Sequence, residues 1–159
     1  MNDHIYLDIN YFFILKALEY ASKIHKNQTR NFSNEPYINH SIRVAKDPEV
    51  LKYDWEGICV AFLHDCIEDA DYPEEVDRYI QKNFSNKIYE AVKLLTHDRL
   101  EKSYEDYIET IMTSGNEIAI AVKYADSLDN SVPTSNMDEK WIERCKTYRL
   151  NSQKYLNIL

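Results

Sequence analysis

The chain has 159 residues, the usual length of one domain and too short to give two domains separate hydrophobic cores. Hydrophobic residues make up 44% of the sequence and charged residues 29%, a balance typical of a globular protein rather than a disordered or fibrous one. Only two glycines and four prolines occur, so the turns that β-hairpins need are scarce. We therefore expect a single all-α domain over residues 1–159.

The charge and the cysteine content limit which binding partners and which cellular compartment we expect. The 19 Lys and Arg against 27 Asp and Glu give a net charge of −8, and no basic run supplies a stripe that follows the phosphates of a long nucleic acid. A small phosphorylated ligand is still compatible with this negative net charge, because a metal ion and a few basic side chains can reverse the electrostatic potential inside one pocket. Three widely spaced cysteines indicate neither a disulfide framework nor a thiolate zinc site. The sequence shows no signal peptide and no apolar run of about 20 residues, so we expect a cytoplasmic protein with no membrane partner.

Helical signals follow one another along the chain. In the first segment, Phe13, Ala17 and Ala21 recur at the spacing of an amphipathic helix. Proline disfavours helical geometry in the residue before it, so we expect an irregular connector over residues 27–37 and a helix end before Pro48. The pattern predicts a bundle of about eight helices, at residues 9–26, 38–46, 55–67, 73–82, 85–95, 103–112, 117–130 and 138–156.

One of these helices has an alternative. Residues 118–125 form a short apolar run, and on periodicity alone a buried strand is an acceptable interpretation. We prefer a helix because alanine is abundant in the run and no neighbouring segment offers a strand partner.

Two strongly apolar segments end in groups that should not be left alone in an apolar interior. His64 and Asp65 close the first, and Asp126 closes the second. An isolated buried carboxylate costs several kcal/mol unless it is paired or bound to a metal. The two ends therefore suggest a shared cation.

The residue types favour a metal that activates water. Glu68 and Asp69 lie one helical turn beyond the first pair and are placed to orient or deprotonate a water and to assist a leaving group. Two imidazoles with two carboxylates suit Mn²⁺, Fe²⁺ or Zn²⁺ better than Ca²⁺. Such an ion makes water nucleophilic toward phosphorus at neutral pH. The candidate ligands are His40, His64, Asp65 and Asp126.

Other residues of these types have simpler interpretations. His97–Asp98 is a second His-Asp pair, but it follows a predicted helix end and is trailed by polar residues, so we interpret it as mainly structural. His4 and His25 lack surrounding carboxylates in the sequence, and we expect them to be ordinary surface histidines. Tyr37 and Tyr124 are expected to pack in the core, because one tyrosine among thirteen is a poor functional marker.

The candidate site residues lie within three stretches, which are Gln28-Thr29-Arg30 with Glu35-Pro36-Tyr37-Ile38-Asn39-His40, Ala61-Phe62-Leu63-His64-Asp65-Cys66-Ile67-Glu68-Asp69, and Val122-Lys123-Tyr124-Ala125-Asp126 with Asn130. Together these three stretches resemble the HD hydrolase domain of the RelA/SpoT family. The order and spacing match, and the similarity runs from about Ala17 to Leu156. The resemblance implies a compact helical bundle with one Mn²⁺ held by the four candidate ligands. It also implies removal of the 3′-pyrophosphate of (p)ppGpp to give GDP or GTP, as in the single-domain small alarmone hydrolases.

The same resemblance implies roles for individual residues. Glu68 and Asp69 match the catalytic pair of the family. A role as surface or salt-bridging groups stays open for the basic residues Arg30, Lys123 and Arg144. The positions that match substrate contacts of the family are Arg30, Asn130, Arg144 and Tyr148.

Departures from the family pattern fall around the substrate rather than the metal. Asn31 stands where the family usually has a second basic residue, and Ala70 stands where a threonine is common. No synthetase half follows, so we expect no alarmone synthesis. These changes keep a second hypothesis open, in which the metal site acts on a nucleoside monophosphate, NADPH or a modified nucleotide. A third hypothesis, a silent nucleotide-sensing module, ranks last because all the metal and acidic positions are present.

Overall fold

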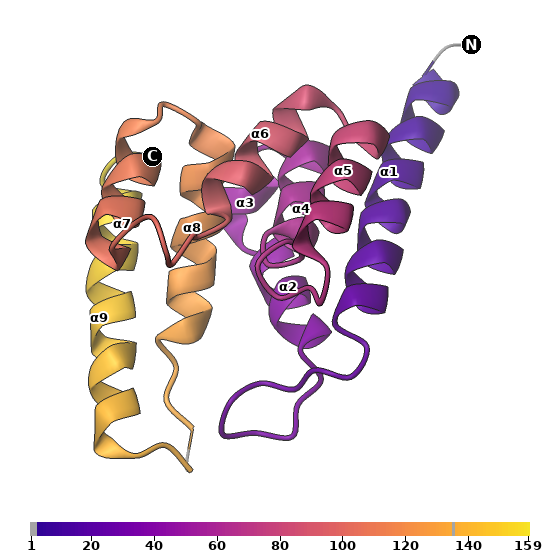
Figure 1. Cartoon of the computed structure of the whole chain (residues 1–159). Coiled ribbons are helices and arrows are strands. Elements are labelled where there is room, and N and C mark those ends of the chain that lie inside the picture. Colours follow the sequence, from indigo (N-terminus) through magenta and orange to yellow (C-terminus); the bar gives the residue numbers. More distant parts are fainter. Residues whose placement is uncertain (1–2, 135) are drawn as a thin grey trace.

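The computed structural model describes the backbone of residues 3–134 and 136–159, and side chains from residue 9 onward within those ranges. Within them the chain forms nine α-helices and no β-strand, which confirms the predicted all-α class (Figure 1). The helices are α1 (Asp3–Ile24), α2 (Ile38–Ala45), α3 (Pro48–Leu51), α4 (Asp54–Leu63), α5 (Pro73–Asn83), α6 (Asn86–Leu95), α7 (Tyr104–Thr113), α8 (Glu117–Asn130) and α9 (Glu139–Leu156).

Helix α4 lies at the centre of the bundle, in contact with α1, α2, α3, α6 and α8. Its composition explains the position, because six of its ten residues are buried and none of these six is charged. Helices α7, α8 and α9 stand on one side of this centre and α1 and α5 on the other (Figure 1). The C-terminal end of α4 is thereby placed beside α8.

The apolar run at residues 118–125 lies within α8, so the strand alternative is wrong. Nine of the fourteen residues of α8 are buried, because α2, α3, α4, α6, α7 and α9 all pack against it. Enclosure by helices explains why the run is apolar without the spacing of a one-sided amphipathic helix. No described helix is both long enough and apolar enough to cross a membrane.

Helix α3 was not predicted, because Asp47-Pro48 was interpreted only as a stop. The Asp47 side chain accepts a hydrogen bond from the Glu49 amide at 2.9 Å, and Pro48 occupies the first turn. This dipeptide therefore ends α2 and also starts a new helix, which is a common use of aspartate and proline. Helix α3 packs closely on α4, since a Cβ atom on Gly57 would lie 2.5 Å from the Val50 carbonyl oxygen.

Two helix ends differ from the predicted ones by four residues or more. Helix α1 begins at Asp3, six residues before the predicted start at Ile9. Helix α4 ends at Leu63 rather than at Ile67, and residues 64–69 form successive turns. The Cys66 amide donates to the Leu63 carbonyl at 3.0 Å, which tightens the chain where the α-helix stops. The functional residues after Leu63 therefore lie on a compact turn segment rather than on a continued helix.

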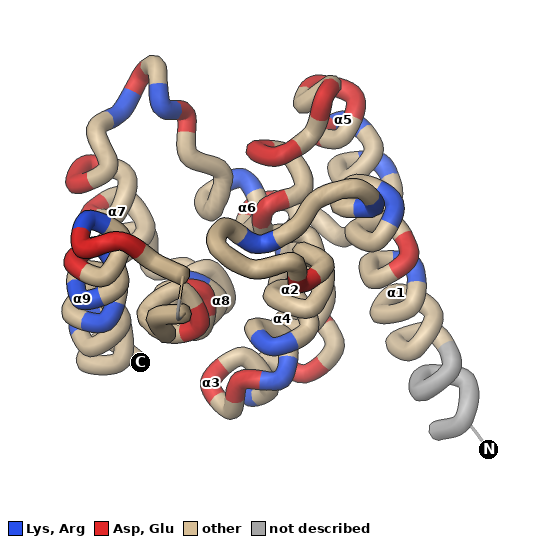
Figure 2. The backbone as a smooth tube through the Cα atoms, turned by 90° about the horizontal axis from the view of Figure 1, so that it is seen from below, with Lys and Arg blue, Asp and Glu red and all other residues tan. Residues whose placement is uncertain are grey.

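The segment between α1 and α2, residues 25–37, is a closed loop that we call the connector. The Arg30 amide donates to the Glu35 carbonyl at 2.9 Å, which brings the two arms of the loop together. At its tip, Phe32 has a φ of 61°, and its ring meets the Trp141 ring edge-on with a centroid distance of 4.9 Å. The connector thus spans the face of the molecule between α1 and the α8–α9 pair (Figure 2).

Candidate active site

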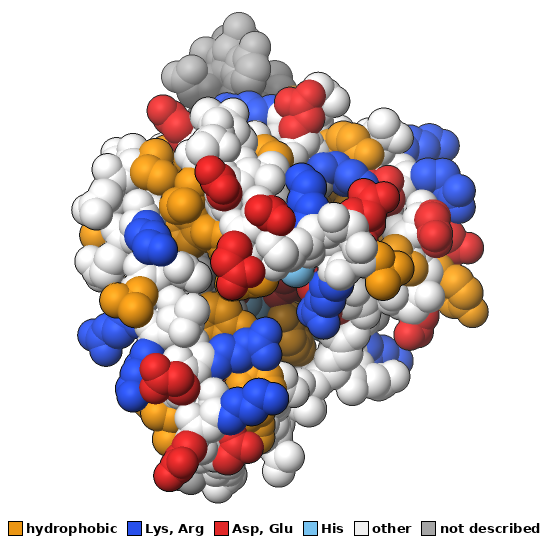
Figure 3. All heavy atoms as spheres, turned by 60° about the vertical axis from the view of Figure 1, so that its left-hand side comes forward, with side chains coloured by type: hydrophobic (Ala, Val, Ile, Leu, Met, Phe, Trp, Pro, Cys, Tyr) orange, Lys and Arg blue, Asp and Glu red, His pale blue; other side chains and the backbone are white. Residues whose placement is uncertain are grey.

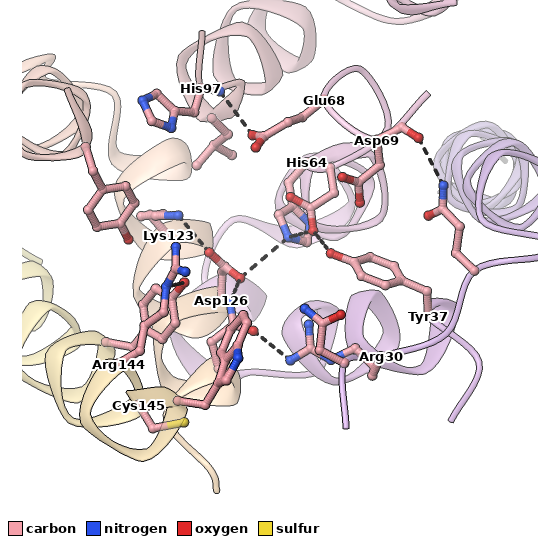
Figure 4. Close-up of a pocket in the computed structure, with 18 of the residues that line it drawn as sticks. Arg30, Tyr37, His64, Glu68, Asp69, His97, Lys123, Asp126, Arg144 and Cys145 are labelled. Carbon is pink, nitrogen blue, oxygen red and sulfur yellow. Dashed lines mark hydrogen bonds and ion pairs between the residues drawn. The ribbon is translucent and has the colours of Figure 1, made fainter. Parts of the chain in front are cut away.

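A cavity of about 590 Å³ opens where the end of α4, the connector, α7, α8 and α9 meet (Figure 4). Nine of the ten predicted site residues line it, and the tenth, His40, is fully buried beside them. A space-filling view shows a hollow with histidine and acidic atoms inside it and basic side chains around it (Figure 3). The volume lies within the range of about 300–1,000 Å³ that is common for small-molecule pockets.

The four predicted metal ligands lie together although they come from three distant segments. The Nε2 atom of His40 is 3.7 Å from Asp65 Oδ2 and 3.3 Å from Asp126 Oδ1. The Nε2 atom of His64 is 2.9 Å from Asp65 Oδ2 and 3.8 Å from Asp126 Oδ1. Ligand atoms at bond lengths of about 2.1 Å around one ion are separated by roughly 3 to 4 Å. His40, His64 and Asp65 each present one ligand atom within 4.8 Å of the others, and Asp126 Oδ1 approaches both imidazoles. The spacing of the first three side chains therefore suits a single divalent ion, with Asp126 beside it.

The hydrogen bonds of the two imidazoles leave their Nε2 atoms free for such an ion. His40 Nδ1 donates to Asp129 Oδ2 at 2.7 Å, and His64 Nδ1 donates to the Ala61 carbonyl at 2.7 Å. Both Nε2 atoms are buried, and neither has a hydrogen-bond partner among the described residues. Their approaches to carboxylate oxygens lack hydrogen-bond geometry, as expected for atoms that share an ion. A ligand histidine fixed through its other nitrogen is the usual arrangement in metal sites.

Asp126 stays ionised despite its burial. Burial by itself would raise its pKa, but the Lys123 ammonium, 2.8 Å from Oδ2, and the two imidazoles hold the pKa of this carboxyl well below its usual range. Asn130 Nδ2 donates to Asp126 Oδ1 at 2.6 Å and orients the group (Figure 4). A buried carboxylate fixed in this way is ready to bind a cation.

Asp65 is also held from one side. The Tyr37 hydroxyl donates to Asp65 Oδ2 at 2.6 Å (Figure 4). Burial raises the pKa of the Tyr37 hydroxyl, and the Asp65 carboxylate raises it further, so Tyr37 remains a hydrogen-bond donor. Tyr37 packs its ring on His25, and its hydroxyl adds a contact to Asp65 that the expected packing role does not include.

The acidic pair beyond the ligands has two different environments. Glu68 accepts hydrogen bonds from the His97 amide at 3.2 Å and from Arg99 Nη2 at 2.6 Å. Asp69 is partly buried, and this burial together with the charges of Asp65 and Glu68 raises its pKa to about 6. Glu68 is thus oriented by donors, whereas Asp69 is able to exchange a proton near neutral pH.

The predicted substrate residues lie in two groups on the cavity wall. On the connector side, Arg30 Nη2 donates to Asn130 Oδ1 at 2.6 Å. On α9, Arg144 Nε donates to the Tyr148 hydroxyl at 3.1 Å, and the Arg144 guanidinium lies 5.2 Å from the centre of the Trp141 ring. Arg30 and Arg144 are drawn from opposite sides toward the same cavity (Figure 4). The wall therefore offers two cations next to the acidic metal cluster.

Sequence reasoning missed several residues that support the site. Asp129 was given no role, although its position three residues after Asp126 places both on one face of α8. Arg43 clamps Asp129, with Nε 2.5 Å from Oδ1, and no sequence signal indicated this contact. His25 is 2% exposed, so its interpretation as a surface histidine is wrong. Its burial follows from packing against Tyr37, since the two rings are stacked at 4.7 Å.

Comparison with known proteins agrees with this geometry. The sequence profile described as "HD domain" matches residues 17–127. The chain is 33% identical over 118 residues to the guanosine-3′,5′-bis(diphosphate) 3′-pyrophosphohydrolase of Vibrio cholerae, covering 69% of this chain and 16% of that protein. It is 35% identical over 117 residues to the bifunctional (p)ppGpp synthase/hydrolase SpoT of Escherichia coli, with the same coverages. The chain therefore spans about one sixth of the length of these curated relatives.

A solved structure shares the fold over nearly the whole chain. It is described as "A metazoan ortholog of SpoT hydrolyzes ppGpp and plays a role in starvation responses". The TM-score is 0.70 at 27% identity, over 92% of this chain and 84% of that one. An all-helical bundle whose His and Asp side chains suit a divalent ion is characteristic of HD-type proteins. The match over residues 17–127 shows that the chain belongs to the HD-domain family.

Proposed function

We propose that the chain is a metal-dependent hydrolase that removes the 3′-pyrophosphate of ppGpp or pppGpp, giving GDP or GTP. The observation that carries this proposal is the convergence of His40, His64 and the Asp65 carboxylate within 4.8 Å of one another, with Asp126 beside them and a second acidic pair in the same cavity. The similarity to relatives named as ppGpp hydrolases supports the choice of substrate.

In the proposed reaction, water adds to the phosphorus attached to the 3′ oxygen, and the bond between that phosphorus and oxygen breaks. A bound divalent ion supplies Lewis acidity that makes the water nucleophilic at neutral pH. Asp69, with a pKa of about 6, accepts the proton of the attacking water and returns it to the 3′ oxygen. Glu68, held by Arg99 and the His97 amide, orients the water.

Basic and aromatic groups of the wall bind the nucleotide in this proposal. Arg30 and Arg144 bind phosphate oxygens, because an arginine guanidinium matches phosphate geometry with two parallel donors. Asn130 and Tyr148 position these guanidinium groups through the bonds that they already make. The acidic interior alone would repel a pyrophosphate group, so the metal ion and the two arginines are both required.

We propose Mn²⁺ as the ion, with Fe²⁺ or Zn²⁺ as alternatives. Two imidazoles and two carboxylates form a mixed nitrogen and oxygen set, which suits these metals. Cys66, which follows Asp65 in the chain, instead has its sulfur 3.8 Å from His25 Nε2 and 3.6 Å from the Phe62 carbonyl. We further propose a small nucleotide, not a long nucleic acid, as the partner, because the net charge is −8. We also propose a cytoplasmic location, since all three cysteines are free thiols, as is usual in a reducing compartment.

The test is incubation of the purified chain with ppGpp and MnCl₂. We expect release of pyrophosphate and GDP, separated by ion-exchange chromatography. Asp65→Ala should lower the rate by about 1,000-fold or more, since the ion contributes several kcal/mol and each 1.4 kcal/mol is about tenfold. If wild type and Asp65→Ala are equally inactive and bind equally little metal, the silent module replaces the proposal.

A second candidate is hydrolysis of another phosphorylated nucleotide at the same metal site. The observation that favours it is Asn31, which lines the cavity where the family usually has a basic residue. A substrate panel with a nucleoside monophosphate, NADPH and ppGpp separates the two candidates. Cleavage of another nucleotide without cleavage of ppGpp would transfer the assignment.

A further inference from the structure

His25 is a buried histidine behind the cavity that the proposed reaction does not use. It is 2% exposed at the end of α1, and it does not line the cavity. Burial lowers its pKa below the ordinary range for histidine, so the imidazole is neutral at pH 7. A neutral imidazole has one donor and one acceptor nitrogen, and its neighbours decide which nitrogen carries the proton.

The contacts of His25 fix that proton and form a directed chain. Asp69 presents its backbone carbonyl, which only accepts, to the Gln28 amide nitrogen at 3.0 Å (Figure 4). The Gln28 amide oxygen therefore faces the other way, 2.6 Å from His25 Nδ1. Because that oxygen only accepts, Nδ1 carries the proton. The hydrogen bonds thus run from His25 to Gln28 to the Asp69 peptide.

A second contact leads from His25 to a metal ligand. The Tyr37 ring is stacked on the His25 ring at 4.7 Å, and the Tyr37 hydroxyl donates to the Asp65 carboxylate at 2.6 Å. The Asp69 amide donates to the Asp65 carbonyl at 2.9 Å, which closes the turn between these two residues. Both ends of the turn that carries the catalytic acids are therefore supported from the His25 side.

We propose that His25 and Gln28 are positioning residues of this site, in which His25 orients the Gln28 amide and that amide holds the Asp69 peptide in place. The inference rests on the proposed hydrolase function, since it assigns Asp69 a role in proton transfer. Gln28 touches neither the four metal ligands nor the phosphate-binding arginines through its described side-chain hydrogen bonds. Substitution of Gln28 should therefore lower kcat and should leave KM and metal binding unchanged.

The test compares Gln28→Leu, His25→Phe and the double variant. Leucine keeps most of the volume of Gln28 and removes both hydrogen bonds, and phenylalanine keeps the stacking on Tyr37 while losing the Nδ1 donor. We expect Gln28→Leu to lower kcat for ppGpp by about 10- to 100-fold, as loss of supporting hydrogen bonds does in metal sites. KM and Mn²⁺ affinity should stay within about twofold of wild type. Gln81→Leu, the same change at an exposed glutamine of α5, is the matched control.

The double variant shows whether His25 and Gln28 act through one series of hydrogen bonds or contribute to the rate separately. If His25 acts through Gln28, the double variant should be no slower than Gln28→Leu, because both changes break one sequence of bonds. Multiplication of the two single effects, or a Gln28→Leu enzyme as fast as wild type, would overturn the inference while leaving the hydrolase function intact. If Gln28→Leu does not fold, Gln28→Glu replaces it, since a carboxylate still accepts from His25 but has no donor for Asp69.

If the proposed hydrolase function itself is wrong, the experiment gives a different result. In that case wild type does not hydrolyse ppGpp, and amide hydrogen exchange over residues 65–69 takes the place of kcat. Faster exchange there in Gln28→Leu than in Gln81→Leu supports the positioning role, and equal exchange overturns it.

Discussion

The floor and the wall of the cavity are built in opposite ways. On the floor, His40, His64 and Asp126 are 0%, 2% and 5% exposed, and a second residue or a backbone carbonyl fixes each of them. On the wall, Arg144 is exposed on α9 and Arg30 lies on the connector between two helices. The fold therefore holds the proposed metal ligands tightly, whereas the proposed substrate contacts depend on residues that packing constrains less.

This difference follows from the cost of burial. A carboxylate or imidazole enclosed by helices must have partners, so each floor residue brings supporting residues with it. An exposed arginine keeps its hydration and needs no fixed partner. Changes on the floor should consequently disturb several residues at once, and changes on the wall should act alone.

Among changes that leave the four proposed metal ligands in place, the largest effect is expected for Asp129, the carboxylate behind His40. Asp129→Ala should lower Mn²⁺ affinity by about 10- to 100-fold, because loss of such a supporting residue usually costs that much. Isothermal titration with Mn²⁺ measures it, with Asp71→Ala at an exposed carboxylate as the control. An affinity within twofold of wild type would mean that the floor does not depend on its supporting residues.

A smaller effect, on stability, is expected for Asp69, which lines the cavity beside the floor residues. Its pKa is raised to about 6, so the folded protein disfavours the ionised form that exists at pH 7. Asp69→Asn should raise the free energy of unfolding of the metal-free protein at pH 7 by about 1 to 2 kcal/mol. The gain should shrink as pH falls through 6 toward 4, where the wild-type carboxyl is protonated when folded. Urea denaturation at both pH values measures this, and an equal gain at each would contradict the assignment.

The smallest effect is expected on the wall. Arg144→Ala should raise KM for ppGpp by about three- to tenfold, since one exposed charged contact contributes roughly 1 kcal/mol. Steady-state kinetics and metal titration should give an unchanged kcat and an unchanged Mn²⁺ affinity. A drop in metal affinity would show that wall and floor are coupled, and Arg149→Ala, at an exposed arginine of the same helix, provides the comparison.

The sequence predicts the floor better than its supports. Apolar runs that end in His64, Asp65 and Asp126 indicate a shared cation, and the all-helical class follows from scarce glycine and helical spacing. The burial of His25 was not predictable in this way, because it depends on stacking against Tyr37 across the connector. Likewise, Asp129 and Arg43 meet only after α2 and α8 pack together.

Helix boundaries near the site show the same limit. Periodicity extends the central helix to Ile67, but α4 ends at Leu63 and the acidic residues lie on turns. Local propensity does not reveal this end, because the turns are held by partners from elsewhere in the chain. Gln28, for example, bonds the Asp69 carbonyl from 41 residues away.

Helix α8 carries Lys123, Asp126, Asp129 and Asn130, all of which serve one side of the cavity. Each residue advances an α-helix by about 100°, so a one-residue deletion within this stretch would turn the residues on the two sides of the deletion away from each other. The proposed metal ligand Asp126, its partner Lys123, the support of His40 and the partner of Arg30 could then no longer keep their present positions together. We therefore expect that insertions and deletions within these two turns of α8 abolish the function of the site, even at positions where single substitutions are tolerated.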